Sequence, residues 1–143
     1  MKIEEIWKDA AGYEGLYQVS NLGRIKSYWR GQDRILKQTL DKRGYYGVRL
    51  YKNGKGKHLN VHRLVAETFL GKIPKGLVVN HINEIKTDNR LENLEICTIK
   101  ENINHGTCIV RRSAARRGQQ HTTETKQKIS TSLKRYFQRQ GEA

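Results

Sequence analysis

The spacing of apolar residues changes near residue 60, and this change limits the chain to a fold that combines a small sheet with helices. Before it, tyrosine and β-branched residues alternate with polar residues between glycines, as is typical of short antiparallel strands. After it, residues 61–69 carry apolar side chains at helical spacing, with Asn60 and Gly71 placed to cap and to end a helix. The sequence therefore predicts an α+β fold with a small antiparallel N-terminal sheet.

Two hairpins are predicted in the strand-forming part. The stretch GLYQVSNLGRIKSYW (residues 15–29) indicates strand, turn and strand, with residues 20–23 as the turn. The stretch GYYGVRLYKNGKGKHLNV (residues 44–61) indicates a second hairpin that bends at Asn53-Gly54.

One face of both hairpins is predicted to carry basic and aromatic side chains. The inward-facing side chains are Ile25 in the first hairpin and Tyr46, Val48 and Leu50 in the second. The outward-facing ones are Arg24, Lys26 and Tyr28 in the first and Tyr45, Arg49 and Tyr51 in the second. An ordinary solvated sheet face is one interpretation. Because the chain is strongly basic, we favour a surface that binds DNA in its major groove.

The charge of the chain restricts the class of partner. The sequence has 28 Lys and Arg residues and 14 acidic ones, which gives a net charge of +14 at pH 7. Nucleic acid is the expected partner, and an anionic membrane surface is the alternative. Because no stretch approaches the ~18 apolar residues of a membrane span, and the N-terminus lacks the apolar run of a signal peptide, we expect a cytoplasmic protein without a membrane partner. Cys97 and Cys108 match no common zinc spacing, so we expect no structural zinc.

Residues 78–106 indicate a strand, a loop, a second strand and a helix. Residues 78–79 form a short apolar strand that leads into Asn80 and His81, and alternation over residues 94–98 indicates the second strand.

Thr98 and Glu101 are spaced as a capping box, and Gly106 stands where the helix would stop. This helix would place Asn102 about one turn from its start, able to face back toward Asn80 and His81.

The last part of the chain is basic and predicted to be helical. Residues 109–143 contain nine Lys or Arg and two acids, a local surplus of +7. Thr122 can cap a helix whose narrow apolar stripe consists of Ile129, Leu133, Tyr136 and Phe137. Lys128, Lys134 and Arg135 lie elsewhere around it. A solvated charge run is the usual explanation for such a pattern; we favour DNA contact, because the stripe allows the helix to dock.

Residues 78–106 resemble the ββα-metal (His-Me finger) core of HNH endonucleases, particularly the homing and phage-encoded branch, with His81, Asn93 and Asn102 at the three named positions. Three other stretches resemble parts that accompany this core: VHRLVAETF (61–69) the preceding helix, WKDAAGYEGLYQVSNLGRIKS (7–27) an N-terminal β-module, and HTTETKQKISTSLKRYF (121–137), less strongly, a DNA-binding helix. The resemblance implies a β-rich DNA-binding module (1–57), a nuclease core with its preceding helix (58–108) and a basic helical DNA-binding tail (109–143).

The resemblance also implies a metal-dependent DNA endonuclease of a bacterial or phage-infected cell. His81 would be the general base, and Asn80 and Asn102 would hold one Mg²⁺ or Mn²⁺. Asn93 would hold the loop and help to orient His81. A monomer on double-stranded DNA would nick one strand, because it has one active site.

Two departures from the family pattern affect these expectations. Many relatives carry an acid where this chain has Asn80, so both implied ligands are neutral, and we expect weak metal binding until the scissile phosphate adds negative charge. The loop after the histidine resembles Asp-Gly-Asn in the family and is Asn83-Glu84-Ile85 here. Because Asn83 tolerates a left-handed backbone better than most residues, we expect the turn to survive.

Three interpretations remain open from the sequence. The first is the endonuclease, the second is a catalytically degenerate sequence-specific DNA-binding protein, and the third is a basic RNA-binding protein. His62 is expected to be structural or to contact a phosphate, and His105 is left outside the metal ligands.

Overall fold

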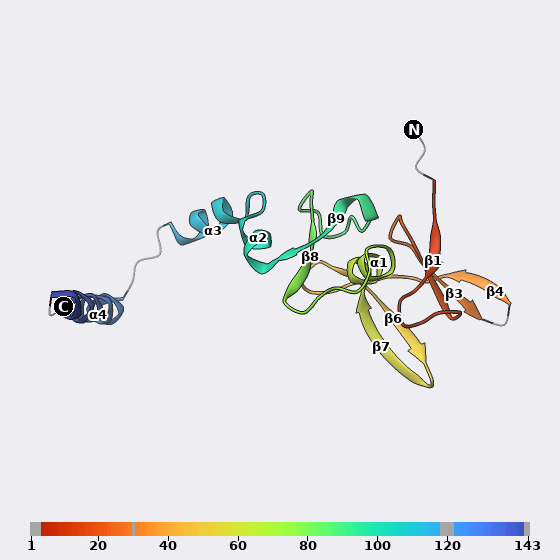
Figure 1. Cartoon of the computed structure of the whole chain (residues 1–143), viewed down its shortest axis with the longest axis horizontal. Coiled ribbons are helices and arrows are strands. Elements are labelled where there is room, and N and C mark those ends of the chain that lie inside the picture. Colours follow the sequence, from red (N-terminus) through yellow and green to blue (C-terminus); the bar gives the residue numbers. More distant parts are fainter. Residues whose placement is uncertain (1–3, 30, 118–121, 142–143) are drawn as a thin grey trace. The chain divides into compact units, whose positions relative to one another are not determined.

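The structure is a computed structural model that describes residues 4–29, 31–117 and 122–141 (Figure 1). The chain folds as two compact units, Met1–Gly106 and Thr107–Ala143. No helix in the described ranges is long and apolar enough to cross a membrane.

The first sheet contains four antiparallel strands in chain order: β1 (Trp7–Asp9), β2 (Tyr17–Ser20), β3 (Ile25–Trp29) and β4 (Gln32–Ile35). The predicted turn joins β2 to β3. Ser20 Oγ accepts hydrogen bonds from the backbone N–H groups of Leu22 and Arg24, and Gly23 adopts the left-handed backbone with φ +80°. The residue pattern of this turn was therefore sufficient to place it.

The second sheet contains β5 (Thr39–Leu40), β6 (Tyr46–Lys52) and β7 (Lys55–Asn60). Asn53 and Gly54 both have positive φ, as a tight hairpin turn requires. Along β6, Val48 and Leu50 are buried, whereas Arg49 and Tyr51 are exposed, which confirms the predicted alternation.

Helix α1 (Val61–Phe69) follows β7 directly and buries Val61, Leu64 and Val65. Asn60 occupies the predicted N-cap position, but its side chain makes no capping hydrogen bond. β7 already holds the preceding backbone in an extended conformation, which lets the helix begin without that bond.

The third sheet is the antiparallel pair β8 (Leu77–His81) and β9 (Leu94–Thr98), with the 3-10 turn η1 (Leu91–Asn93) before β9. Helix α2 (Ile99–Asn104) starts at the predicted capping box, in which Thr98 Oγ1 accepts from the Glu101 N–H and the Glu101 carboxylate accepts from the Thr98 N–H. Gly106 follows with φ +55°.

One hydrophobic core joins all three sheets to α1. It consists of Ala10, Val19, Ile25, Val48, Leu50, Val61, Leu64, Val65 and Leu94. Figure 1 shows α1 between the β8–β9 hairpin and the N-terminal strands. Residues on both sides of the predicted boundary at 57/58 thus share a core, and that boundary stays a prediction.

The second unit consists of α3 (Cys108–Arg116) and α4 (Thr123–Gly141). Thr122 Oγ1 accepts from the Thr125 N–H, which confirms the predicted cap. Ile129 and Leu133 of the predicted apolar stripe are exposed on α4. The side chains of Tyr136 and Phe137, which were predicted to complete that stripe, lie outside the described residues.

Candidate active site

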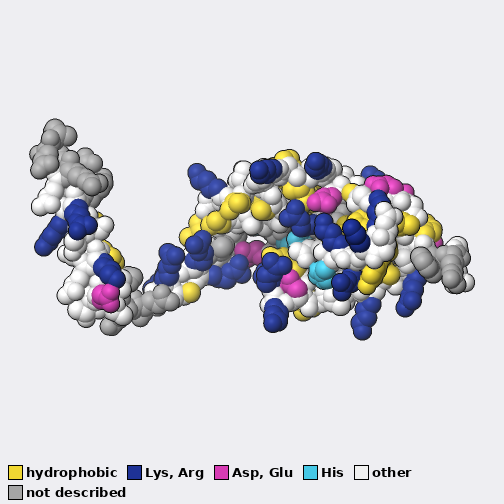
Figure 2. Space-filling model, turned by 90° about the horizontal axis from the view of Figure 1, so that it is seen from below, with side chains coloured by type: hydrophobic (Ala, Val, Ile, Leu, Met, Phe, Trp, Pro, Cys, Tyr) yellow, Lys and Arg dark blue, Asp and Glu magenta, His cyan; other side chains and the backbone are white. Residues whose placement is uncertain are grey.

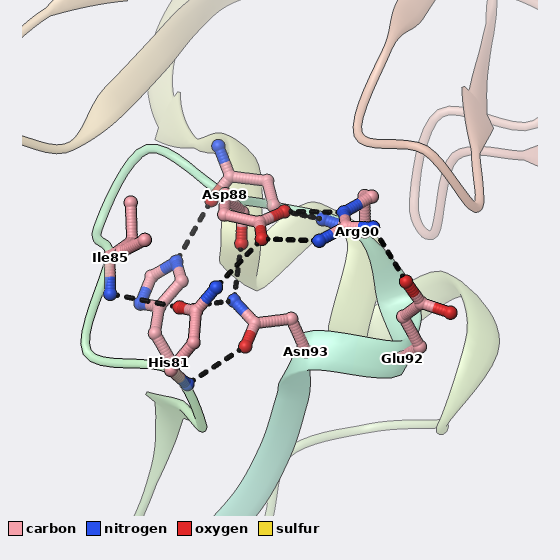
Figure 3. A network of polar contacts seen from close by, with 8 residues as sticks. His81, Ile85, Asp88, Arg90, Glu92 and Asn93 are labelled. Carbon is pink, nitrogen blue, oxygen red and sulfur yellow. Dashed lines mark hydrogen bonds and ion pairs between the residues drawn. The ribbon is translucent and has the colours of Figure 1, made fainter.

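The loop after β8 is held closed by Asn93, which is only 6% exposed. Its Oδ1 accepts from the Asn83 N–H at 2.9 Å, and its Nδ2 donates to Asn83 Oδ1 at 2.9 Å and to the Asp88 carbonyl at 2.8 Å (Figure 3). One buried amide therefore satisfies both of its ends with loop atoms, which explains why asparagine is tolerated here. A role of Asn93 in orienting His81 stays a prediction.

The rim of this loop carries an ion-pair network. Arg90 donates two hydrogen bonds of 2.8 Å to the Asp88 carboxylate and one of 2.7 Å to Glu92. The hydrogen bonds from Arg90, assisted by one from Asn83, lower the pKa of Asp88 to about 2. Asp88 therefore remains ionised, and its charge is already paired within the loop.

The turn of the loop is present, but its left-handed residue is Glu84, with φ +61°, and not Asn83. Asn83 uses its side chain instead, because its Oδ1 accepts from both the Ile85 N–H and Asn93 Nδ2. Side-chain hydrogen bonds of Asn83 thus hold the turn, and the strained left-handed backbone lies at the next residue, Glu84.

His81 lies at the end of β8, is 5% exposed, and is hydrogen-bonded to Asn89, a residue that no sequence pattern singled out. Its Nε2 lies 3.0 Å from Oδ1 of Asn89, which is equally buried. An amide oxygen only accepts, so this contact favours the tautomer with the proton on Nε2, which leaves Nδ1 as the acceptor. No local pattern distinguishes Asn89 from the other asparagines of this segment; only the fold of the loop brings it to His81.

His81 belongs to a cluster of three rings with Tyr45 and His62. The His62 and His81 centroids are 5.2 Å apart at 64°, and Tyr45 lies 4.9 Å from His62 and 6.0 Å from His81. His62 Nδ1 is buried without a hydrogen-bond partner among the described residues. Burial, together with the nearby His81, lowers the pKa of His62 to about 4, so His62 is neutral at pH 7. This environment favours a structural role for His62.

Two cations lie over Tyr45 beside this cluster. Lys86 Nζ is 4.9 Å and the Arg43 guanidinium 5.9 Å from the Tyr45 ring centroid, and Lys86 also donates to the Arg43 carbonyl. Figure 2 shows histidine side chains among Lys and Arg side chains on one face of the protein. The surroundings of His81 thus favour an anionic ligand such as a phosphate.

The implied metal ligands lie on β8 and α2, two elements that pack together. Asn80 Nδ2 donates to Glu95 Oε1 at 2.8 Å, and Asn102 is half-buried. Within the described ranges, no three His, Cys, Asp or Glu side chains are grouped to hold a metal ion. Amide oxygens are donors that suit Mg²⁺ or Mn²⁺, so the donor type fits such an ion although both amides are neutral.

Tyr45 aside, the sheet residues predicted to contact DNA have two kinds of environment. Arg24 pairs with Glu5, and Lys26 pairs with Asp33 at 3.1 Å. Tyr28, Arg49 and Tyr51 instead line one groove between the first and second sheets, together with Arg34. The fold therefore gathers three of these residues in one place, and acids already engage two others.

In the second unit, Lys128, Lys134 and Arg135 are all exposed on α4. Lys128 pairs with Glu124 at 2.6 Å.

Comparison with known proteins gives two family matches that together span most of the first unit. Residues 5–51 match the NUMOD4 motif, and residues 60–103 match an HNH endonuclease family. DNA endonuclease I-HmuI of Bacillus phage SP01 is 46% identical over 97 residues, which are 68% of this chain and 55% of that protein. An uncharacterised HNH endonuclease of Acanthamoeba polyphaga mimivirus is 45% identical over 109 residues, 73% of this chain and 26% of that protein.

A solved structure is also similar. It concerns DNA binding and cleavage by the HNH homing endonuclease I-HmuI, and it matches with a TM-score of 0.62 at 38% identity over 87% of this chain and 66% of that one. The chain spans about half the length of the phage relative and about a quarter of the mimivirus one.

Proposed function

Because this chain belongs to the HNH endonuclease family, we propose that it is a metal-dependent DNA endonuclease that hydrolyses a phosphodiester bond with His81 as general base. The observation that carries the proposal is the 3.0 Å hydrogen bond between His81 Nε2 and Asn89 Oδ1. By holding the proton on Nε2, Asn89 leaves Nδ1 ready to accept a proton from the attacking water. Asn89 is thus a positioning residue for the base.

Asn80 and Asn102 would hold one Mg²⁺ or Mn²⁺ through their amide oxygens. When bound, such an ion supplies charge relief on the phosphoryl oxygens and on the departing 3′ oxygen. The chain's own residues would keep the reacting groups in place: Asn93 by closing the loop, and Lys86 and Arg43 by attracting the phosphate.

Double-stranded DNA is the proposed substrate, bound by a monomer that nicks one strand. Exposed basic and aromatic side chains would contact the duplex: Tyr28, Arg49 and Tyr51 from the sheets, and Lys128, Lys134 and Arg135 from α4. Arg24 and Lys26 would have to exchange their acidic partners for phosphates before they contribute. Contacts of this kind position the protein on DNA without specifying a sequence.

The test is conversion of supercoiled plasmid to open circle at low salt, with Mg²⁺, Mn²⁺ or EDTA. We expect metal-dependent nicking by the wild type and a loss on the order of 10²–10⁴-fold in His81→Ala, since that is the usual contribution of a general base. His58→Ala is the matched control, because His58 is exposed on β7, outside the three-ring cluster.

Equal activity of wild type and His81→Ala would show that the base is wrongly assigned. The neutral Asn80 supports a second candidate, a DNA-binding protein without cleavage. Tight DNA binding without nicking, on plasmids that carry a site selected by the protein, would identify it.

A further inference from the structure

We propose that the carboxylate of Glu95 supplies the negative charge of the divalent-metal site, because the implied ligand Asn80 is neutral and cannot supply it. The inference rests on the proposed function and names a residue outside the expected pair of ligands.

The first support is the pairing of Glu95 with Asn80. The two residues are directly opposite in the β8–β9 register, and Asn80 Nδ2 donates to Glu95 Oε1 at 2.8 Å. An ionised carboxylate has no proton to donate, so it selects the nitrogen end of the amide. Asn80 Oδ1 is consequently turned away from Glu95, and it accepts no hydrogen bond from any described residue. Glu95 therefore leaves the oxygen of Asn80 available to a cation.

The second support is the position of α2. Glu95 and Cys97 are two residues apart on β9, so their side chains leave the same face of the hairpin. Helix α2 packs against both β8 and β9, and His105 Nε2, just after the end of α2, lies 4.0 Å from Glu95 Oε1. The end of α2 thus approaches the face of the hairpin that carries Asn80 and Glu95. This helix includes Asn102, the second implied ligand.

The third support is that other acidic side chains of this segment already have partners. Asp88 and Glu92 pair with Arg90, and Glu101 accepts from the Thr98 N–H in the capping box. Glu95 pairs with no lysine or arginine of the described residues.

The Glu95 side chain is 42% exposed, which leaves it accessible to an ion from solvent. A carboxylate is the oxygen ligand that Mg²⁺ and Mn²⁺ favour, and two neutral amides alone provide no net charge to hold a dication.

The test is Mn²⁺ titration of the whole chain, with free Mn²⁺ followed by electron paramagnetic resonance. Glu95→Gln removes the charge while keeping an oxygen that can accept from Asn80. We expect it to weaken Mn²⁺ binding by about 10-fold or more, the usual effect of losing a group that supports a metal site. Glu92→Gln removes an equal charge from the same segment and is expected to bind Mn²⁺ like the wild type. Thermal unfolding of each variant checks that it is folded.

A rescue variant tests whether charge is the cause. Asn80→Asp in the Glu95→Gln background returns one carboxylate to the same pair, and we expect it to recover the affinity. Wild-type affinity in Glu95→Gln, an equal loss in Glu92→Gln, or no recovery in the double variant would each overturn the proposal. Plasmid nicking by the wild type decides the endonuclease function separately, so failure of the Glu95 role does not remove that function.

Discussion

At the scale of single residues, His62 is the most unusual side chain beside the candidate base. It is 7% exposed and has a buried ring nitrogen without a hydrogen-bond partner among the described residues, yet it packs against His81 and Tyr45. Such a group is costly to bury, and more costly when charged. The neutral ring of His62 thus packs against His81, and its burial lowers the free energy of unfolding in acid.

This cost gives a prediction for pH. The pKa of His62 falls from 6.5 in the unfolded chain to about 4 in the folded protein. Between these values the unfolded chain binds a proton that the folded protein does not, so stability is full above pH 6.5 and falls as the pH drops toward 4. Linkage gives a loss of about 3 kcal/mol from this residue across the window.

Denaturant unfolding at pH 7 and at about pH 4 measures the effect. We expect His62→Phe to lose less stability than the wild type between these two conditions, whereas His58→Phe, at an exposed histidine, follows the wild type. Parallel losses in the wild type and His62→Phe would refute the assignment.

At the scale of elements, the turn between β2 and β3 packs against the loop of the candidate site. The Leu91 N–H donates to the Asn21 carbonyl at 2.8 Å. A Cβ placed on Gly23 would lie 2.9 Å from Cβ of Asn89, closer than real Cβ contacts allow. The N-terminal hairpin therefore helps to place Asn89, and through it His81.

Gly23→Ala should damage both the fold and the site. It combines left-handed strain of roughly 1–2 kcal/mol with a clash that costs about 1–3 kcal/mol more. Gly12→Ala is the matched control, because Gly12 has nearly the same φ, +79°, and nothing within 4 Å of its added Cβ.

Denaturant unfolding and plasmid nicking report the two effects of Gly23→Ala. We expect a larger loss of stability than in Gly12→Ala and a lower nicking rate at a temperature where both variants are folded. The same stability and rate in the two variants would contradict a role of this turn in placing Asn89.

At the scale of the whole molecule, positive charge is shared between the two units. Residues 109–143 contribute +7, half of the net charge of +14. Because neutralised phosphates release counterions, the salt dependence of DNA binding reports how much of this charge makes contact.

A chain that ends at Gly106 tests the role of the second unit. If the full chain contacts ~6–10 phosphates, its affinity for duplex DNA should fall ~10³–10⁵-fold between roughly 50 and 200 mM salt. We expect a shallower slope for the shortened chain, measured by fluorescence anisotropy with a labelled duplex. Equal slopes would mean that α3 and α4 make no phosphate contacts.

Local sequence patterns were sufficient for most elements of the fold. The Asn53-Gly54 bend, the Thr98–Glu101 capping box and the Thr122 cap each depend on residues within a few positions of one another. Short-range steric and hydrogen-bonding preferences decide such features, and they act wherever the segment lies in the molecule. The same patterns placed His81 at a strand end and Asn93 in the loop that follows it.

Tertiary structure alone decided how the site is assembled. The pairing of Asn89 with His81, the contact of Gly23 with Asn89 and the opposition of Glu95 and Asn80 each join residues of different strands, turns or loops. Periodicity tells which face a side chain takes, but not the register between strands or the partner that a loop brings to it. The sequence by itself therefore determined the two hairpins, the main helices and the positions that match the HNH pattern, because local preferences act within each segment. Long-range packing decided which further residues, such as Asn89 and Glu95, meet them and which polar atoms pair.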